Sequence, residues 1–156
     1  MTSAKKSYTL FETVDKRSPP GGITVIVSVP SGWAEISVDG AGGPTFLAPG
    51  MSAAARDLVT LATFPRRRNA SGTSLDDVAS VQDGYGEDSF TDERLDGERR
   101  WLVQDIVLGN GVRRVHGRLM ALHEPTGFVV SCAVVLHGDA TRLLREARAL
   151  CESLTM

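Results

Sequence analysis

The feature that most constrains the fold of this chain is the apolar run Phe128-Val-Val-Ser-Cys-Ala-Val-Val-Leu136. Its four valines favour a strand over a helix, and the turn residues Pro125-Thr-Gly127 lie directly before it. The run is apolar at both alternating sets of positions, whereas a half-exposed strand alternates apolar and polar residues. It therefore predicts a strand at the centre of a sheet that is covered on both faces.

The segments before this run predict an antiparallel meander. Arg99 to Leu108 and Val112 to His123 are expected as strands, and Gly109-Asn-Gly111 between them is the signal of a tight hairpin. Phe90 to Leu95 is expected as a further short strand. The second half of the chain thus supplies consecutive strands that pair with their neighbours in sequence.

The first half is punctuated by glycine and proline, and two helices complete the predicted set of elements. Strands are expected over 7–12, 23–29, 33–38 and 57–64, with a long surface loop over 39–50. Ser74 opens a short predicted helix from about Leu75 to Gln82. A final helix after Asp139 has the apolar stripe Leu143, Leu144, Ala147, Leu150, Cys151 and Leu154. We therefore predict an α+β fold, an antiparallel β-sheet flanked by helices (an α/β/α sandwich), as one domain over 1–156 with residues 1–22 partly irregular.

Charge, hydropathy and cysteine usage restrict the partners and the compartment. The formal net charge is −2, so no global positive field favours nucleic acid or an anionic membrane. No stretch approaches the roughly 18 apolar residues of a membrane span, and no apolar core follows Lys5 and Lys6 as in a signal peptide. We expect a cytoplasmic protein, in which Cys132 and Cys151 are buried thiols rather than a disulfide.

Motifs for catalysis, metal binding and cofactor binding are missing from the sequence. The histidines His116, His123 and His137 have no metal-site spacing, and no G-x-S-x-G or phosphate-binding glycine loop occurs. The carboxylates between Asp83 and Asp96 do not match a calcium-binding loop and indicate a solvated acidic segment. The sequence predicts no enzyme, no metal and no cofactor. An unfamiliar enzyme site remains an alternative, and it would need a histidine beside an acidic residue in a cleft.

Two features are candidates for partner binding. Arg66, Arg67 and Arg68 form a basic loop, but three charges without interleaved aromatic residues are too few to predict nucleic-acid binding. Trp33 and Trp101 each open a predicted strand, where a core position is expected and a binding anchor is the alternative. The candidate partner-binding residues are therefore Trp33, Arg66, Arg67, Arg68 and Trp101.

The segment Ile23-Thr-Val-Ile-Val-Ser-Val-Pro-Ser-Gly-Trp33 resembles the opening of PsbP-like domains, in which a strand ends in a proline, a small residue, a glycine and a tryptophan. The order that follows, with Leu95-Asp-Gly97 before a long strand and a closing helix, is similar over about residues 20–155. The resemblance implies an antiparallel sheet sandwiched by helices. It also implies a non-enzymatic binder, because the superfamily includes extrinsic photosystem subunits, a Ran-binding import factor, LpqN-type lipoproteins and chaperones of secreted effectors.

These observations lead to a functional hypothesis with one main rival. We expect a non-enzymatic cytoplasmic binding protein, a chaperone or adaptor for a secreted or effector protein, whose partner is another protein and neither nucleic acid nor a membrane. The alternative is a small-molecule or lipid-binding protein with a pocket between the sheet and the C-terminal helix.

Overall fold

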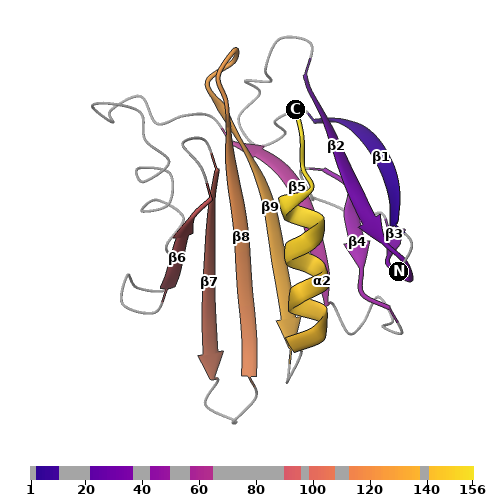
Figure 1. Cartoon of the computed structure of the whole chain (residues 1–156), viewed down its shortest axis with the longest axis vertical. Coiled ribbons are helices and arrows are strands. Elements are labelled where there is room, and N and C mark those ends of the chain that lie inside the picture. Colours follow the sequence, from indigo (N-terminus) through magenta and orange to yellow (C-terminus); the bar gives the residue numbers. More distant parts are fainter. Residues whose placement is uncertain are drawn as a thin grey trace.

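Nine strands and one helix make up the part of the chain described by this computed structural model (Figure 1). The described residues are 3–10, 22–36, 43–49, 57–64, 90–95, 99–107, 113–137 and 141–156. The elements are β1 (Ser3–Leu10), β2 (Ile23–Pro30), β3 (Ala34–Ile36), β4 (Thr45–Leu47), β5 (Leu58–Phe64), β6 (Phe90–Arg94), β7 (Arg99–Val107), β8 (Arg113–His123), β9 (Phe128–His137) and α2 (Thr141–Glu152).

The larger of two antiparallel sheets has seven strands in the order β3-β4-β5-β9-β8-β7-β6. The apolar run forms β9, which is the middle strand and pairs with β5 on one side and β8 on the other. Val130, Cys132 and Val134 are buried on one face of β9, and Val129 and Ser131 on the other. The prediction of a central strand covered on both faces is confirmed. The predicted pairing of the two strands before it is also confirmed, with Val107 of β7 opposite Arg113 of β8.

One face of this sheet is covered by α2 together with the hairpin β1–β2 (Figure 1). The helix buries the side chains of Ala147, Leu150 and Cys151, which belong to one apolar cluster with β8 and β9. The hairpin joins the same layer, because Ile26 of β2 and Thr155 after α2 exchange two backbone hydrogen bonds of 2.9 Å.

The opposite face of the large sheet has a smaller apolar cluster of its own. Leu102, Met120, Leu122 and Val129 are each at most 8% exposed and come from β7, β8 and β9. Because side chains alternate along a strand, these residues point away from α2. The centre of the sheet is therefore buried on both sides, as its sequence requires.

The predicted fold class, an antiparallel sheet flanked by helices in an α/β/α sandwich, is wrong. The structure is dominated by two antiparallel sheets, and α2 is the one helix among the residues it describes. β1 and β2 pair only with each other among the described strands, so they form a separate two-stranded sheet beside α2. Ile23, Val25 and Val27 are buried on the face of this hairpin that packs into the core. The helix predicted over 75–82 lies outside the described residues.

The segment 39–50, predicted as a surface loop, contains the strand β4. Thr45, Phe46 and Leu47 are all buried, and β4 pairs with both β3 and β5. A strand of three residues between Pro44 and Pro49 is too short for an alternation of apolar and polar residues to be recognised. The N-terminal strand also begins at Ser3, four residues before the predicted start.

The two cysteines form a disulfide, so the expectation of separate buried thiols is wrong. The Cα atoms of Cys132 on β9 and Cys151 on α2 are 5.5 Å apart, within the ordinary range for a bridge. Both residues are fully buried. Their spacing of 19 residues gives no sign of the pairing, which arises because α2 packs along β9 with Cys151 over Cys132.

Candidate partner-binding site

A hollow of about 310 Å³ lies where the end of the hairpin β1–β2 meets the turn after β2. We call it the Trp33 hollow. Its lining residues are Ser3, Ala4, Lys6, Val29, Pro30, Ser31, Gly32 and Trp33. It is therefore bordered by both strands at one end of the hairpin and by one tight turn.

The hollow exists because the hairpin extends past the core. Side chains at every second position of β1 share a face, so Ala4, Lys6, Tyr8 and Leu10 lie on the same side. Leu10 is buried, and the ring of Tyr8 contacts that of Phe46 edge-on with centroids 5.9 Å apart. Ala4 and Lys6, farther along the same face, are exposed and line the hollow instead.

Tyr8 fixes the hairpin over the sheet at the inner border of this region. Its hydroxyl donates a hydrogen bond of 2.9 Å to Oε2 of Glu35 on β3. Burial, together with this hydrogen bond and the negative charge of Glu35, raises the pKa of Tyr8 far above its ordinary value. The phenol therefore stays neutral and serves as a fixed donor.

The turn after β2 places the indole of Trp33. Pro30 ends the strand, and the backbone N–H of Trp33 donates to the carbonyl oxygen of Pro30 across 3.3 Å. Residues 30–33 thus form a four-residue β-turn with Gly32 at its third position. Gly32 has a positive φ of 91°, which glycine adopts readily and which type II turns require at that position. A Cβ on Gly32 would also lie 3.1 Å from Cγ of Pro49.

Trp33 itself combines an apolar wall with an unused donor. The residue is 7% exposed and belongs to the main apolar cluster, yet its Nε1 is buried without a hydrogen-bond partner. A buried donor without an acceptor costs roughly 1–3 kcal/mol, and this one is closed off from solvent, so the cost lies within the core. The hollow itself offers the apolar surface of Val29 and Trp33 and one cationic side chain, Lys6, that attracts an oxygen acceptor or an anion.

Trp101 takes the core role that was expected for a tryptophan. It is 3% exposed, and a Cβ on Gly117 of the neighbouring strand would lie 2.7 Å from its Cη2. The guanidinium of Arg148 covers the ring at 5.4 Å from the centroid. Of the two predicted partner-binding residues that the structure describes, Trp33 borders the hollow and Trp101 does not. Arg66, Arg67 and Arg68 lie outside the described residues.

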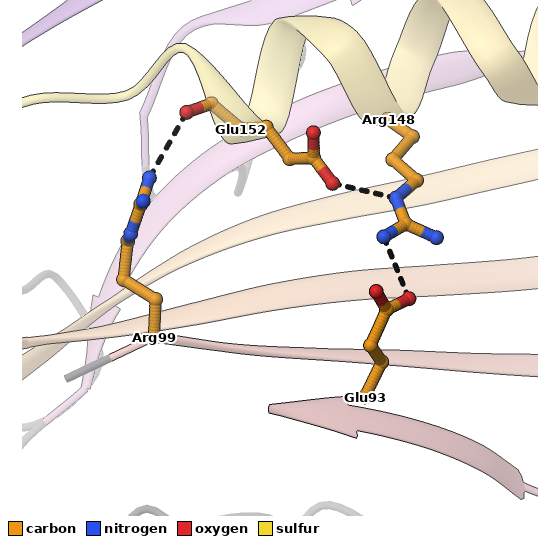
Figure 2. A network of polar contacts seen from close by, with 4 residues as sticks. All are labelled: Glu93, Arg99, Arg148 and Glu152. Carbon is orange, nitrogen blue, oxygen red and sulfur yellow. Dashed lines mark hydrogen bonds and ion pairs between the residues drawn. The ribbon is translucent and has the colours of Figure 1, made fainter. Parts of the chain in front are cut away.

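A polar network holds α2 to the far edge of the large sheet (Figure 2). Arg148 donates from one terminal nitrogen to Oε2 of Glu93 on β6 at 2.7 Å, and from Nε to Oε1 of Glu152 at 2.6 Å. Arg99 of β7 donates to the backbone carbonyl oxygen of Glu152 at 3.1 Å. These contacts connect α2 to β6 and β7, at the edge of the large sheet, whereas the helix itself packs over β8 and β9. We assign the network a structural role.

His137 forms a pair with a buried acidic residue that sequence reasoning missed. Oδ1 of Asp57 accepts hydrogen bonds from the backbone N–H of His137 at 3.0 Å and from its Nδ1 at 2.7 Å. Asp57 is 2% exposed and precedes β5, eighty positions away in the sequence, so no local signal could have revealed the contact. Among the residues that the structure describes, no group of three or more His, Cys, Asp or Glu is placed to hold a metal ion.

The other two histidines have different surroundings. Nδ1 of His123 lies 2.7 Å from Oγ1 of Thr126 within the turn between β8 and β9. His116 is half-buried on β8, where burial and then the positive charges of Arg114 and Arg118 lower its pKa below 6.5. None of the three histidines lines the Trp33 hollow.

The interface between α2 and the sheet, where the alternative hypothesis places a pocket, is closely filled. Ala147, Leu150, Cys151 and Leu154 are between 0 and 3% exposed, and the disulfide occupies the middle of the interface. These side chains leave no space for a drug-sized ligand between them and β9. No helix in the described part of the chain is long and apolar enough to cross a membrane.

The fold that these elements define is PsbP-like. The chain is similar to the crystal structure of LpqN, involved in cell envelope biogenesis of Mycobacterium tuberculosis, with a TM-score of 0.58, 17% identity, and coverage of 97% of this chain and 90% of that one. It is also similar to the solution structure of CyanoP, the cyanobacterial PsbP of Synechocystis sp. PCC 6803, with a TM-score of 0.54, 12% identity, and coverage of 100% and 94%. No protein-family model matches the sequence, and no curated protein matches it significantly.

Proposed function

We propose that this chain is a non-enzymatic binding protein, an adaptor or chaperone that holds a segment of another protein in the Trp33 hollow. The observation that carries the proposal is an open surface hollow in which the apolar side chains of Val29 and Trp33 lie near Lys6. An apolar surface beside a positive charge suits a polypeptide segment that has apolar and acidic side chains.

A protein segment suits this site better than a small molecule does. The hollow is open and bordered by the strand β1, whereas small-molecule sites enclose most of the ligand surface. The place where an enclosed pocket was expected, between α2 and the sheet, is filled. The PsbP-like fold agrees with a binding role, although a fold by itself does not fix a function.

The compartment in which the protein works is a separate part of the proposal. The cytoplasmic location expected from the sequence remains a prediction, and the Cys132–Cys151 disulfide favours an oxidising compartment instead. A client that is itself exported would be met there. Quenching intact cells in acid, alkylating the free thiols under denaturing conditions and analysing the protein by mass spectrometry distinguishes the two: alkylated cysteines mean a reducing compartment.

Site-specific photocrosslinking in the native host tests the proposal. A photoreactive residue replaces Ser31, which is exposed at the rim of the hollow, and in a matched control it replaces Arg145, which is exposed on α2. We expect one protein to crosslink at Ser31 and not at Arg145. The added substitution Ala4→Trp, which fills the hollow from an exposed position, should abolish the crosslink. An undiminished crosslink with Ala4→Trp would refute the proposed site.

A further inference from the structure

We infer that the segment bound at the Trp33 hollow is an extended acidic strand that adds to the outer edge of β1 and directs one side chain into the hollow. This inference rests on the proposed function and specifies the chemistry of the partner. It follows from three properties of β1, which are its free edge, its charge and the direction of its side chains.

The first property is an unpaired strand edge. Among the described residues β1 pairs with β2 alone, over all eight of its positions, and it forms the outer margin of the hairpin in Figure 1. In an antiparallel strand, half of the backbone N–H and C=O groups point away from the partner strand. Such an edge accepts an extended peptide through main-chain hydrogen bonds, the mode known as strand addition.

The second property is a local positive charge on a protein whose net charge is negative. Lys5 and Lys6 are two of the three lysines in the whole sequence, and they are adjacent and exposed on β1. Neither is in an ion pair with any residue that the structure describes, and β1 contains no acidic residue. This charge favours a partner strand with carboxylates.

The same charge argues against a second copy of this chain as the occupant. Two β1 strands that paired edge to edge would bring the lysines of both copies together. Like charges on directly paired strands are destabilising, and edge lysines are a common protection against self-association. The edge is therefore selective for a strand of opposite charge.

The third property is the direction of the side chains beside the hollow. A strand added to β1 places alternate side chains on the face that carries Ala4 and Lys6, which is the face that borders the hollow. An apolar side chain on that face lies beside Ala4 at the border of the hollow, and a neighbouring carboxylate meets Lys6.

The test measures binding of a fluorescein-labelled heptapeptide, Thr-Glu-Thr-Val-Thr-Glu-Thr, by fluorescence polarisation. On an extended strand its glutamates and valine share one face. We expect Lys6→Glu to weaken binding about tenfold and Lys5→Glu, on the opposite face of β1, to weaken it much less. Replacing both glutamates of the peptide by lysine should abolish binding. Circular dichroism confirms that both variants are folded.

Backbone methylation of the same peptide tests the strand itself. One peptide carries N-methyl groups at its odd positions and the other at its even positions, with charge and side chains unchanged. Strand addition uses the N–H groups of one set only, so one methylated peptide should lose binding and the other should keep it. Equal binding by both would overturn the inference, as would equal effects of Lys5→Glu and Lys6→Glu. In that case a crosslink at Ser31 that is lost with Ala4→Trp would still support the proposed function.

Discussion

The two elements that cover one face of the large sheet, α2 and the hairpin β1–β2, differ in how completely they are packed. The helix fully buries most of its apolar stripe, is bonded covalently to β9 through Cys151, and is tied to the sheet edge through Arg148. The hairpin is packed at Leu10 and Tyr8 but extends beyond the core at Ala4 and Lys6. The same layer thus contains a region that stabilises the fold and an exposed region to which we assign partner binding.

The largest expected difference between the two regions is the cost of truncating a side chain. Leu150→Ala in α2 should lower the free energy of unfolding by about 2–5 kcal/mol, because Leu150 is fully buried against β9. Ile26→Ala in the hairpin should cost below about 1 kcal/mol, because that side chain is 42% exposed. Urea denaturation of both variants measures the two free energies of unfolding. Similar decreases in the two variants would contradict the expected difference.

The disulfide should account for the next largest share of the stability of the helical region. It closes a loop with a sequence separation of 19 residues, so its reduction should lower the free energy of unfolding by about 3 kcal/mol. Denaturation with and without a phosphine reductant measures this. Heptapeptide binding should persist in the reduced protein that remains folded, because the hollow includes neither cysteine. Loss of binding in parallel with stability would show that the two regions are coupled.

Two glycines allow a matched test of the regions. Gly117→Ala would place its Cβ 2.7 Å from the ring of Trp101 beneath Arg148, and we expect a cost of about 1–3 kcal/mol. Gly32→Ala would force a side chain into a left-handed backbone conformation, at about 1–2 kcal/mol. The stabilities should be similar, but peptide affinity should fall only with Gly32→Ala, since Gly32 shapes the hollow. Equal peptide affinities of the two variants would mean that the turn at Gly32 is not part of the binding site.

The polar network of Figure 2 should contribute less than any of these. Arg148 and Glu93 form a short ion pair, but their side chains are 33% and 52% exposed, so solvent screens the interaction. We expect Arg148→Gln to cost below about 1 kcal/mol. A double-mutant cycle with Glu93→Gln isolates the energy of the pair. A coupling well above that limit would mean that the network, rather than the apolar stripe, holds α2 in place.

The smallest expected effect is a dependence of stability on pH. The pKa of His116 in the folded protein is lowered, so the unfolded chain binds more protons between that pKa and 6.5. Stability is therefore complete above pH 6.5 and declines as the pH falls toward the lowered pKa. Urea midpoints at about pH 7.5 and about pH 5.5 should differ less in His116→Gln than in the wild type. Heptapeptide binding should change little over that range, because the hairpin strands contain no histidine.

Much of the fold could be predicted from the sequence where the signals are local. The apolar run of β9, the paired strands β7 and β8, and the stripe of α2 occur within a few residues of their predicted bounds. Each is specified by the periodicity of its own side chains or by an adjacent turn. The turn of Pro30 to Trp33 was also visible, because proline and glycine restrict the backbone by themselves.

The candidate site could be predicted only in part, for the same physical reason. Trp33 was identified as a possible anchor, but Ala4 and Lys6 were not, since nothing in the N-terminal sequence shows where the core ends beneath β1. The Asp57–His137 pair joins residues that are eighty positions apart. Such contacts depend on which elements are neighbours in space.

By itself, then, the sequence determined the closing helix, the strands other than β4, and the order in which these elements follow one another. The tertiary structure decided that β1 and β2 leave the main sheet and share a layer with α2, that Cys151 reaches Cys132, and that a hollow remains under the end of the hairpin. The physical reason is one of range. Periodicity and turn chemistry act over a few residues, whereas the choice of a packing partner depends on the apolar surface that every other element leaves exposed.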